Sequence, residues 1–185
     1  MTTYLDNAAT SFPKPEAVYA AMDRAGRTQI ANPGRAGHRM AIAAEHILDD
    51  GRHRLNQFFH GAGPERWIFT FNGTDALNIA FKGVLNPGDH VITSNLEHNS
   101  VSRPLRALEL AGTISVTRVM ADGSGTIDPD AIRQAITPKT RLIAVTHCSN
   151  VLGTVQPIAE IGRIARERDL LLLVDAAQTA GVISI

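Results

Sequence analysis

Two polar segments of the chain carry residues that could bind a phosphate or a planar ligand. Asn72-Gly-Thr-Asp75 follows an apolar run and leads into a helical pattern. Thr74 and the free N–H groups of a helix start can hold a phosphate, and Gly73 permits a tight turn. A threonine cap on an ordinary helix explains the segment equally well. His98 follows a second apolar run, where an imidazole could stack on a flat ligand or move a proton, or could be a partly exposed loop residue.

Two further segments carry an amide and a carboxylate in equivalent places. Asn150 offers an amide donor and acceptor beside a glycine bend, although asparagine is also common in turns. Asp175 follows Leu170–Val174, and a carboxylate fixed after five buried apolar residues is costly unless it meets a cation or hydrogen-bond donors. We therefore expect Asp175 to hold a proton on a heterocyclic nitrogen and Gln178 to hydrogen-bond a nearby oxygen. Together these groups suit a flat, phosphorylated, nitrogen-containing cofactor such as pyridoxal phosphate.

Two other sets of reactive side chains are interpreted as having no catalytic role. His46, His53 and His60 recur every seven residues, which corresponds to about 10.5 Å along a helix and is too far for neighbours to share one metal ion. They are read as a solvated stripe, and no metal site is predicted. Cys148 is interpreted as a small core residue rather than a nucleophile, because nothing in the sequence supplies it with a base.

The elements that would position these residues alternate between apolar runs and helical patterns. Strands are expected over residues 67–71, 90–94, 114–119, 141–146 and 170–174, and helices over 39–59, 74–84, 100–110 and 157–168, with a short helix opening at Asp128–Pro129. Apolar strands separated by helices predict a mainly parallel sheet covered on both faces. Ligands of such sheets bind beyond the carboxyl ends of the strands, where all the candidate residues fall.

Composition narrows the possible classes of protein. The 185 residues contain 18 Lys plus Arg and 18 Asp plus Glu, so no electrostatic footprint for nucleic acid or an anionic membrane is expected. A single cysteine excludes an internal disulfide. The N-terminus lacks the pattern of a signal peptide and the longest apolar run is far too short to span a bilayer, which predicts a soluble, cytoplasmic protein.

Several motifs in register resemble those of the class V aminotransferase-like proteins, the family of the cysteine desulfurases and selenocysteine lyases. The similarity covers essentially the whole chain and is closest to a bacterial cysteine-desulfurase-like subfamily. The motifs occur in the expected order as Tyr4-Leu-Asp-Asn-Ala-Ala-Thr10, Ser11-Phe-Pro-Lys-Pro-Glu-Ala17, Asn32-Pro-Gly-Arg-Ala-Gly-His38, Phe71-Asn-Gly-Thr-Asp75, Glu97-His-Asn-Ser100, Ser149-Asn-Val-Leu-Gly153 and Val174-Asp-Ala-Ala-Gln178.

The resemblance implies a fold-type I pyridoxal phosphate enzyme of the α/β class, normally a homodimer. It implies that Gly73 and Thr74 bind the cofactor's phosphate, that Asp75 in the same segment is a further cofactor-binding residue, and that His98 stacks on the ring and relays protons. Asp175 would pair with the pyridine nitrogen. Asn150 and Gln178 would contact the ring hydroxyl or the substrate. The implied reaction converts cysteine to alanine and passes sulfur to an enzyme persulfide, which feeds an acceptor protein in iron–sulfur cluster assembly or thiolation.

The resemblance also implies residues that the sequence does not show. The family's Schiff-base lysine and persulfide cysteine lie beyond the Asp-x-x-Gln segment, and Lys14, Lys82, Lys139 and Cys148 match neither position. We therefore expect an N-terminal fragment, inactive alone, with residues 1–30 lining the active site, residues 31–185 forming part of the cofactor-binding large domain, and the small C-terminal domain absent. Selenocysteine lyase, another class V aminotransferase, and a non-catalytic or split-enzyme half that needs a partner chain remain alternatives.

Overall fold

The computed structural model describes residues 3–35 and 37–183 and divides into two compact units. One unit extends to Phe69 and the other begins at Thr70. The expectation that residues 1–30 line an active site and residues 31–185 form part of the large domain stays a prediction. No helix of the described residues is long and apolar enough to cross a membrane.

The first unit is built from two helices and a short 3₁₀ turn. These are α1 (Glu16–Thr28), α2 (Arg39–Phe58) and the turn Pro64–Arg66. The helix predicted over residues 39–59 is confirmed as α2, whose start is capped by His38, since its Nδ1 accepts from the Ala41 amide at 3.2 Å. No element was predicted over α1, which buries none of its residues.

The strand predicted over residues 67–71 is wrong, because the segment has no ladder partner among the described residues. Trp67 is bound to α2 instead. Its ring stacks on Phe59 at 5.3 Å, its Nε1 donates to Asn56 Oδ1 at 3.2 Å, and its carbonyl accepts from Arg52 Nε at 3.1 Å. Trp67 therefore contacts a helix rather than taking a position in the sheet.

The second unit contains a four-stranded parallel sheet, as the alternating pattern predicted. Its strands are β1 (His90–Ser94), β2 (Ser115–Val119), β3 (Thr140–Thr146) and β4 (Leu171–Asp175), in the order β2-β1-β3-β4. The helices are α3 (Gly73–Val84), α4 (Asn99–Leu110), α5 (Pro129–Gln134) and α6 (Ile158–Glu167). Each matches a predicted helix within one or two residues, and Asp128 caps α5 as expected.

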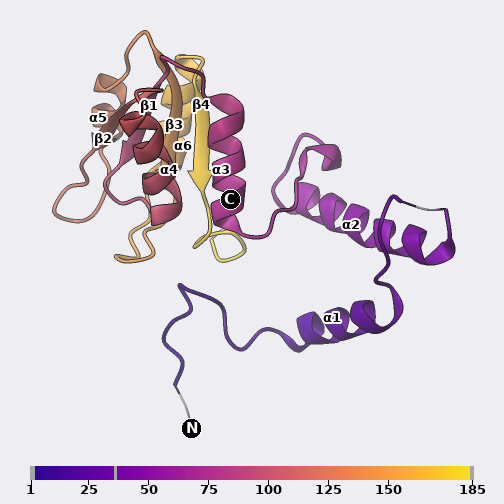
Figure 1. Cartoon of the computed structure of the whole chain (residues 1–185). Coiled ribbons are helices and arrows are strands. Elements are labelled where there is room, and N and C mark those ends of the chain that lie inside the picture. The colour runs from indigo at the N-terminus through magenta and orange to yellow at the C-terminus, as the bar shows by residue number, and fades with distance from the viewer. Residues whose placement is uncertain (1–2, 36, 184–185) are drawn as a thin grey trace. The chain divides into compact units, whose positions relative to one another are not determined.

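Helices cover both faces of this sheet (Figure 1). Successive residues of β1 point to opposite faces, so that Val91 packs with Phe81 of α3 and Leu105 of α4. Ile92 packs on the other face with Ile132 of α5 and Ile161 of α6. The sequence interpretation of a two-sided apolar sheet is thus confirmed for the central strands.

The outer strands are less buried than the sequence suggested. All five residues of β1 are buried, whereas β4 is partly exposed along its length because it lies at an edge of the sheet. The expectation that Asp175 follows five buried apolar residues is therefore wrong. Asp175 is itself only half-buried.

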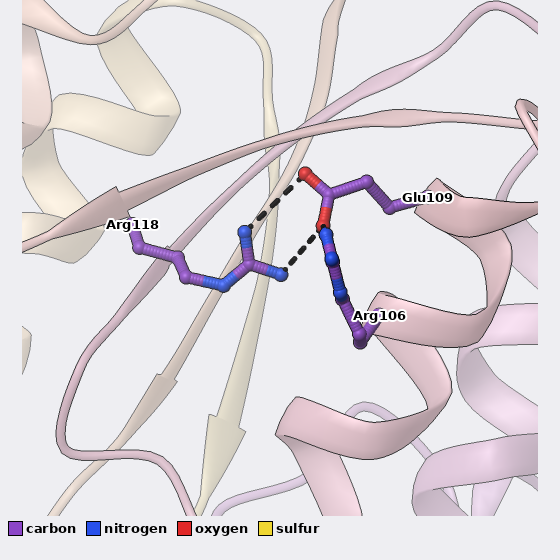
Figure 2. Close-up of polar contacts among 3 residues, drawn as sticks. All are labelled: Arg106, Glu109 and Arg118. Carbon is purple, nitrogen blue, oxygen red and sulfur yellow. Dashed lines mark hydrogen bonds and ion pairs between the residues drawn. The ribbon is translucent and has the colours of Figure 1, made fainter.

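A cluster of ion pairs ties α4 to the other edge strand, β2 (Figure 2). The Glu109 carboxylate accepts from Arg106 at 2.8 Å and from Arg118 at 2.9 Å. The hydrogen bonds from Arg118 and then Arg106 lower the pKa of Glu109. Because the cluster is largely solvated, its net contribution to stability is about 1 kcal/mol or less.

Candidate functional site

The parallel sheet brings the polar segments that follow β1, β3 and β4 to one edge, the carboxyl ends of the strands. His98 lies beyond β1, Asn150 beyond β3, and Asp175 ends β4. The N-terminus of α3, with Thr74, reaches the same region through its contact with the start of α4. These loops belong to the second unit, so their arrangement is internal to it.

The start of α3 offers backbone N–H donors that a ligand could use. Asn72 caps the helix through Oδ1, which accepts from the Asp75 amide at 2.9 Å. The amides of Gly73 and Thr74 meet no protein acceptor among the described residues. A side chain built at Gly73 would meet nothing within 4 Å, so the space beside these amides is open. Gly73 has no left-handed backbone, however, and the tight turn expected there is not what requires glycine.

Asp75 belongs to the local turn. Its Oδ2 accepts from the Phe71 amide at 3.4 Å, while its own amide donates to Asn72. The two side chains thus close the helix start from both sides, in the manner of a capping box. A direct contact between Asp75 and a cofactor stays a prediction.

A chain of hydrogen bonds joins the starts of α3 and α4. Thr74 Oγ1 lies 2.8 Å from Ser100 Oγ, which lies 2.7 Å from His98 Nδ1. Ser100 is buried, whereas Thr74 and His98 are exposed. The structure therefore brings together the predicted phosphate-binding threonine and the predicted ring-stacking histidine through a residue that the sequence did not single out.

His98 is also the cap of α4. Its Nδ1 accepts from the Ser100 amide at 3.1 Å, so the neutral ring carries its proton on Nε2. This assignment follows from the hydrogen-bond pattern. The cap fixes the position of the imidazole while its outer nitrogen stays available to a ligand.

Glu97 is a second residue that the sequence analysis did not select. Its Oε1 accepts from Ser94 Oγ at 2.5 Å and from the Thr146 amide at 3.1 Å, which links the ends of β1 and β3. Its Oε2 is buried with no hydrogen-bond partner in the described structure. Burial, together with the negative charge of Asp175, raises the pKa of Glu97 to about 7 despite the hydrogen bonds from Ser94 and Thr146. The sequence places Glu97 three residues after β1, and the structure shows that every residue of this strand is buried.

Asp175 ends β4 close enough to the Glu97 carboxyl group for its charge to affect the pKa of Glu97. Its Oδ1 accepts from the Ala177 amide at 3.0 Å, and its carbonyl accepts from the His147 amide at 2.9 Å. The second bond ties the end of β4 to the end of β3. Gln178 is half-buried in the turn that follows.

Asn150 lies in an exposed turn after β3. The buried Ser149 holds this turn, since its Oγ accepts from the Val151 and Leu152 amides at 3.3 and 3.2 Å. Gly153 adopts a φ of 72°, the left-handed conformation that glycine tolerates best. In the described part of the chain no hydrogen bond joins the Asn150 side chain to the other candidates, so its role stays a prediction.

The donor set fits a phosphorylated heterocycle. Free amides at a helix start suit a phosphate, an exposed imidazole suits a ring face, and a half-buried carboxylate suits a protonated ring nitrogen. Thr74, His98, Ser100 and Arg103 line a groove of about 560 Å³, which is within the range of small-molecule sites. Residues 3–35 and 37–183 contain no group of three or more His, Cys, Asp or Glu residues that could hold a metal ion.

Comparison with known proteins gives one family. The family model for class-V aminotransferases matches residues 3–185. The chain is 40% identical to a probable cysteine desulfurase of Methanothermobacter thermautotrophicus, over 96% of this chain and 44% of that protein. It is 36% identical to the cysteine desulfurase IscS of Dictyoglomus turgidum, over 98% of this chain and 46% of that protein. The chain thus spans less than half the length of these relatives.

Solved structures with the same fold include cysteine desulfurases. The apo cysteine desulfurase of Thermococcus onnurineus NA1 matches with a TM-score of 0.89 and 31% identity, over 98% of this chain and 45% of that one. A structure of SspA in complex with cysteine matches with a TM-score of 0.88 and 35% identity, over 96% of this chain and 51% of that one.

Proposed function

Because the chain belongs to the class-V aminotransferase family, we propose that its second unit binds pyridoxal phosphate as part of a cysteine desulfurase. The observation that carries the proposal is the hydrogen-bonded connection between Thr74 and His98 at the carboxyl edge of the sheet. It joins a phosphate-binding helix start to an imidazole that can cover a ring. The similarity to proteins named cysteine desulfurase supports the choice of reaction within the family.

Each residue has a distinct task in this proposal. The Gly73 and Thr74 amides bind the phosphate at the positive end of α3. His98, fixed as the cap of α4, stacks on the ring and accepts or returns a proton at Nε2. Asp175 keeps the ring nitrogen protonated, and Asn150 and Gln178 bind the ring hydroxyl or the substrate. When bound, pyridoxal phosphate supplies an electron sink for the substrate Cα.

The proposed substrate is L-cysteine, which is converted to alanine with transfer of its sulfur to an enzyme persulfide. The similarity to a structure described as a complex with cysteine supports this choice over selenocysteine and other amino donors. We further propose a cytoplasmic homodimer that passes sulfur to an acceptor protein. The lysine that binds the cofactor covalently is not among Lys14, Lys82 and Lys139, none of which follows the Asp175–Gln178 segment.

The test measures alanine and sulfide released from cysteine by the protein as its native cell makes it, loaded with pyridoxal phosphate. We expect activity with cysteine and a loss of about 100-fold in kcat/KM for Asp175→Asn, because the substitution removes the charge facing the ring nitrogen. Asp130→Asn is the matched control, since Asp130 lies on α5 outside the site.

Two results would contradict the proposal. Cofactor-loaded protein that releases neither product is not a cysteine desulfurase, and selenocysteine and common amino donors would then be tried in the same assay. Full activity of Asp175→Asn would remove Asp175 from its role while leaving the reaction in place.

A further inference from the structure

The connection between Thr74 and His98 passes through one hydroxyl group, that of Ser100. Ser100 Oγ lies 2.8 Å from Thr74 Oγ1 and 2.7 Å from His98 Nδ1. A hydroxyl has a single proton, so Ser100 can donate to only one of its two neighbours at a time. The hydrogen bonds between Thr74, Ser100 and His98 therefore have a definite direction of donation.

The cap of α4 fixes that direction in the absence of a ligand. Because His98 Nδ1 accepts from the Ser100 amide, it has no proton of its own to donate. Ser100 Oγ must then donate to His98 Nδ1, and Thr74 Oγ1 must donate to Ser100 Oγ. In this state the Thr74 hydroxyl proton is already used and faces away from any ligand.

A phosphate beside Thr74 reverses the preference. Phosphate oxygens of a dianion only accept hydrogen bonds, so a bond from the Thr74 hydroxyl requires its proton to turn toward the phosphate. Ser100 is then free to donate to Thr74 Oγ1, and His98 Nδ1 keeps only its bond from the Ser100 amide. The groups involved move by rotation of two hydroxyl protons and need no change of the backbone.

We propose that Ser100 is a positioning residue that couples phosphate binding at Thr74 to the hydrogen bonding of the His98 imidazole. The inference rests on the proposed function for its ligand, since the phosphate would be that of the cofactor. Arg103 is the charged side chain that lines the same groove, and the Glu97 carboxyl beside His98 in the chain is directed to Ser94 and Thr146. Neither interrupts the contact between Ser100 and its two partners.

The proposed coupling predicts how the loss of the Ser100 hydroxyl changes the affinity for phosphate. In Ser100→Ala the Thr74 hydroxyl has no partner to give up, so phosphate should bind as tightly as in the natural protein or up to about fivefold more tightly, one hydrogen bond being worth about 1 kcal/mol. A residue that simply supports the site would weaken binding when removed. The sign of the change therefore separates the two roles.

The experiment records the imidazole nitrogen resonances of ¹⁵N-labelled protein at about pH 8, where histidines are largely neutral, with increasing inorganic phosphate. The His98 Nδ1 resonance should move on addition of phosphate in the natural protein, and the movement should be absent in Ser100→Ala and restored in Ser100→Thr, which keeps the hydroxyl. Ser102→Ala is the matched control on the same helix, because the Ser102 hydroxyl donates to the Glu97 carbonyl at 3.3 Å and takes no part in the contact between Thr74 and His98.

An unchanged response in Ser100→Ala, or no response in the natural protein at a phosphate concentration that saturates binding, would overturn the coupling. Weaker phosphate binding by Ser100→Ala would do the same. Binding of pyridoxal phosphate followed by its absorbance tests the proposed function separately. A protein that binds phosphate with the Ser100 response but does not bind pyridoxal phosphate would refute the function and leave the coupling intact.

Discussion

Replacing Glu97 by glutamine should change how the stability of the second unit depends on pH. The carboxyl group is held between the ends of β1 and β3, where Oε1 accepts from Ser94 Oγ and the Thr146 amide. Oε2 is buried and finds no partner in the described structure, so an ionised carboxylate leaves one oxygen both desolvated and unbonded. Glutamine keeps the accepting oxygen and cannot ionise.

The magnitude follows from the pKa of the group. Burial, the largest cause, raises the pKa of Glu97 from 4.5 to about 7. A raised pKa in the folded state means that folding favours the protonated form, so the stabilisation is complete below about pH 4.5 and is lost as the pH rises through about 7. A difference of about 2.5 pKa units corresponds to about 3 kcal/mol.

Urea denaturation of the two proteins between about pH 5 and pH 8.5 measures this effect. The free energy of unfolding of the natural protein should fall relative to that of Glu97→Gln by about 2.5 kcal/mol across that range, since part of the stabilisation is already lost at pH 5. Glu160→Gln is the matched control, since Glu160 is exposed on α6, and it should show no such divergence. A difference between Glu97→Gln and the natural protein that does not vary with pH would refute the reasoning.

Three other substitutions test the packing that supports the site. His90 is buried with Nδ1 and Nε2 each 2.8 Å from a threonine hydroxyl, and burial lowers the pKa of its imidazole. The natural protein should therefore lose unfolding free energy relative to His90→Gln as the pH falls below about 6.5. A difference in unfolding free energy that stays constant with pH in urea denaturation would contradict this. Gln156→Ala should cost about 2–4 kcal/mol in unfolding free energy, because the buried side-chain amide accepts from Ile127 N and donates to the Gly125 carbonyl, each at 2.9 Å. A measured cost below about 1 kcal/mol would show that other groups replace these hydrogen bonds. Phe81→Ala should cost about 3–5 kcal/mol, since Phe81 is fully buried between α3 and the sheet, and an unfolding midpoint within the error of the natural protein would be incompatible with that position.

The sheet could be predicted well from the sequence because its apolar segments are bounded by turn residues. The segments at residues 90–94 and 141–146 have apolar centres and are bounded by turns, and they became the central strands β1 and β3. The run at 67–71 has the same appearance. It became a loop because a strand needs a partner, and partners are set by topology rather than by the apolar pattern of one segment.

The same distinction explains which carboxyl group was misjudged. A buried carboxylate needs a partner, but Asp175 is only half-buried because β4 is an edge strand. Glu97 is the carboxyl group that meets this condition, since it follows the fully buried central strand β1. Only the strand order, which no single apolar run encodes, distinguishes the two.

The predicted site residues were placed at one edge by parallel topology, and that part could be anticipated. The bond between Thr74 and His98 through Ser100 could not, because it depends on how the starts of α3 and α4 approach each other across 26 residues of sequence. Motifs indicate which side chains are present, whereas helix packing decides which of them touch.

The most direct test of a non-covalent cofactor site is calorimetric titration with pyridoxine 5′-phosphate, which has the ring and phosphate of the cofactor but no aldehyde to react with lysines. The account predicts saturable binding to one site per chain, weakened about tenfold in Thr74→Val, because that substitution removes one charge-assisted hydrogen bond to the phosphate. The absence of binding heat at any accessible concentration, or equal binding by Thr74→Val, would contradict it.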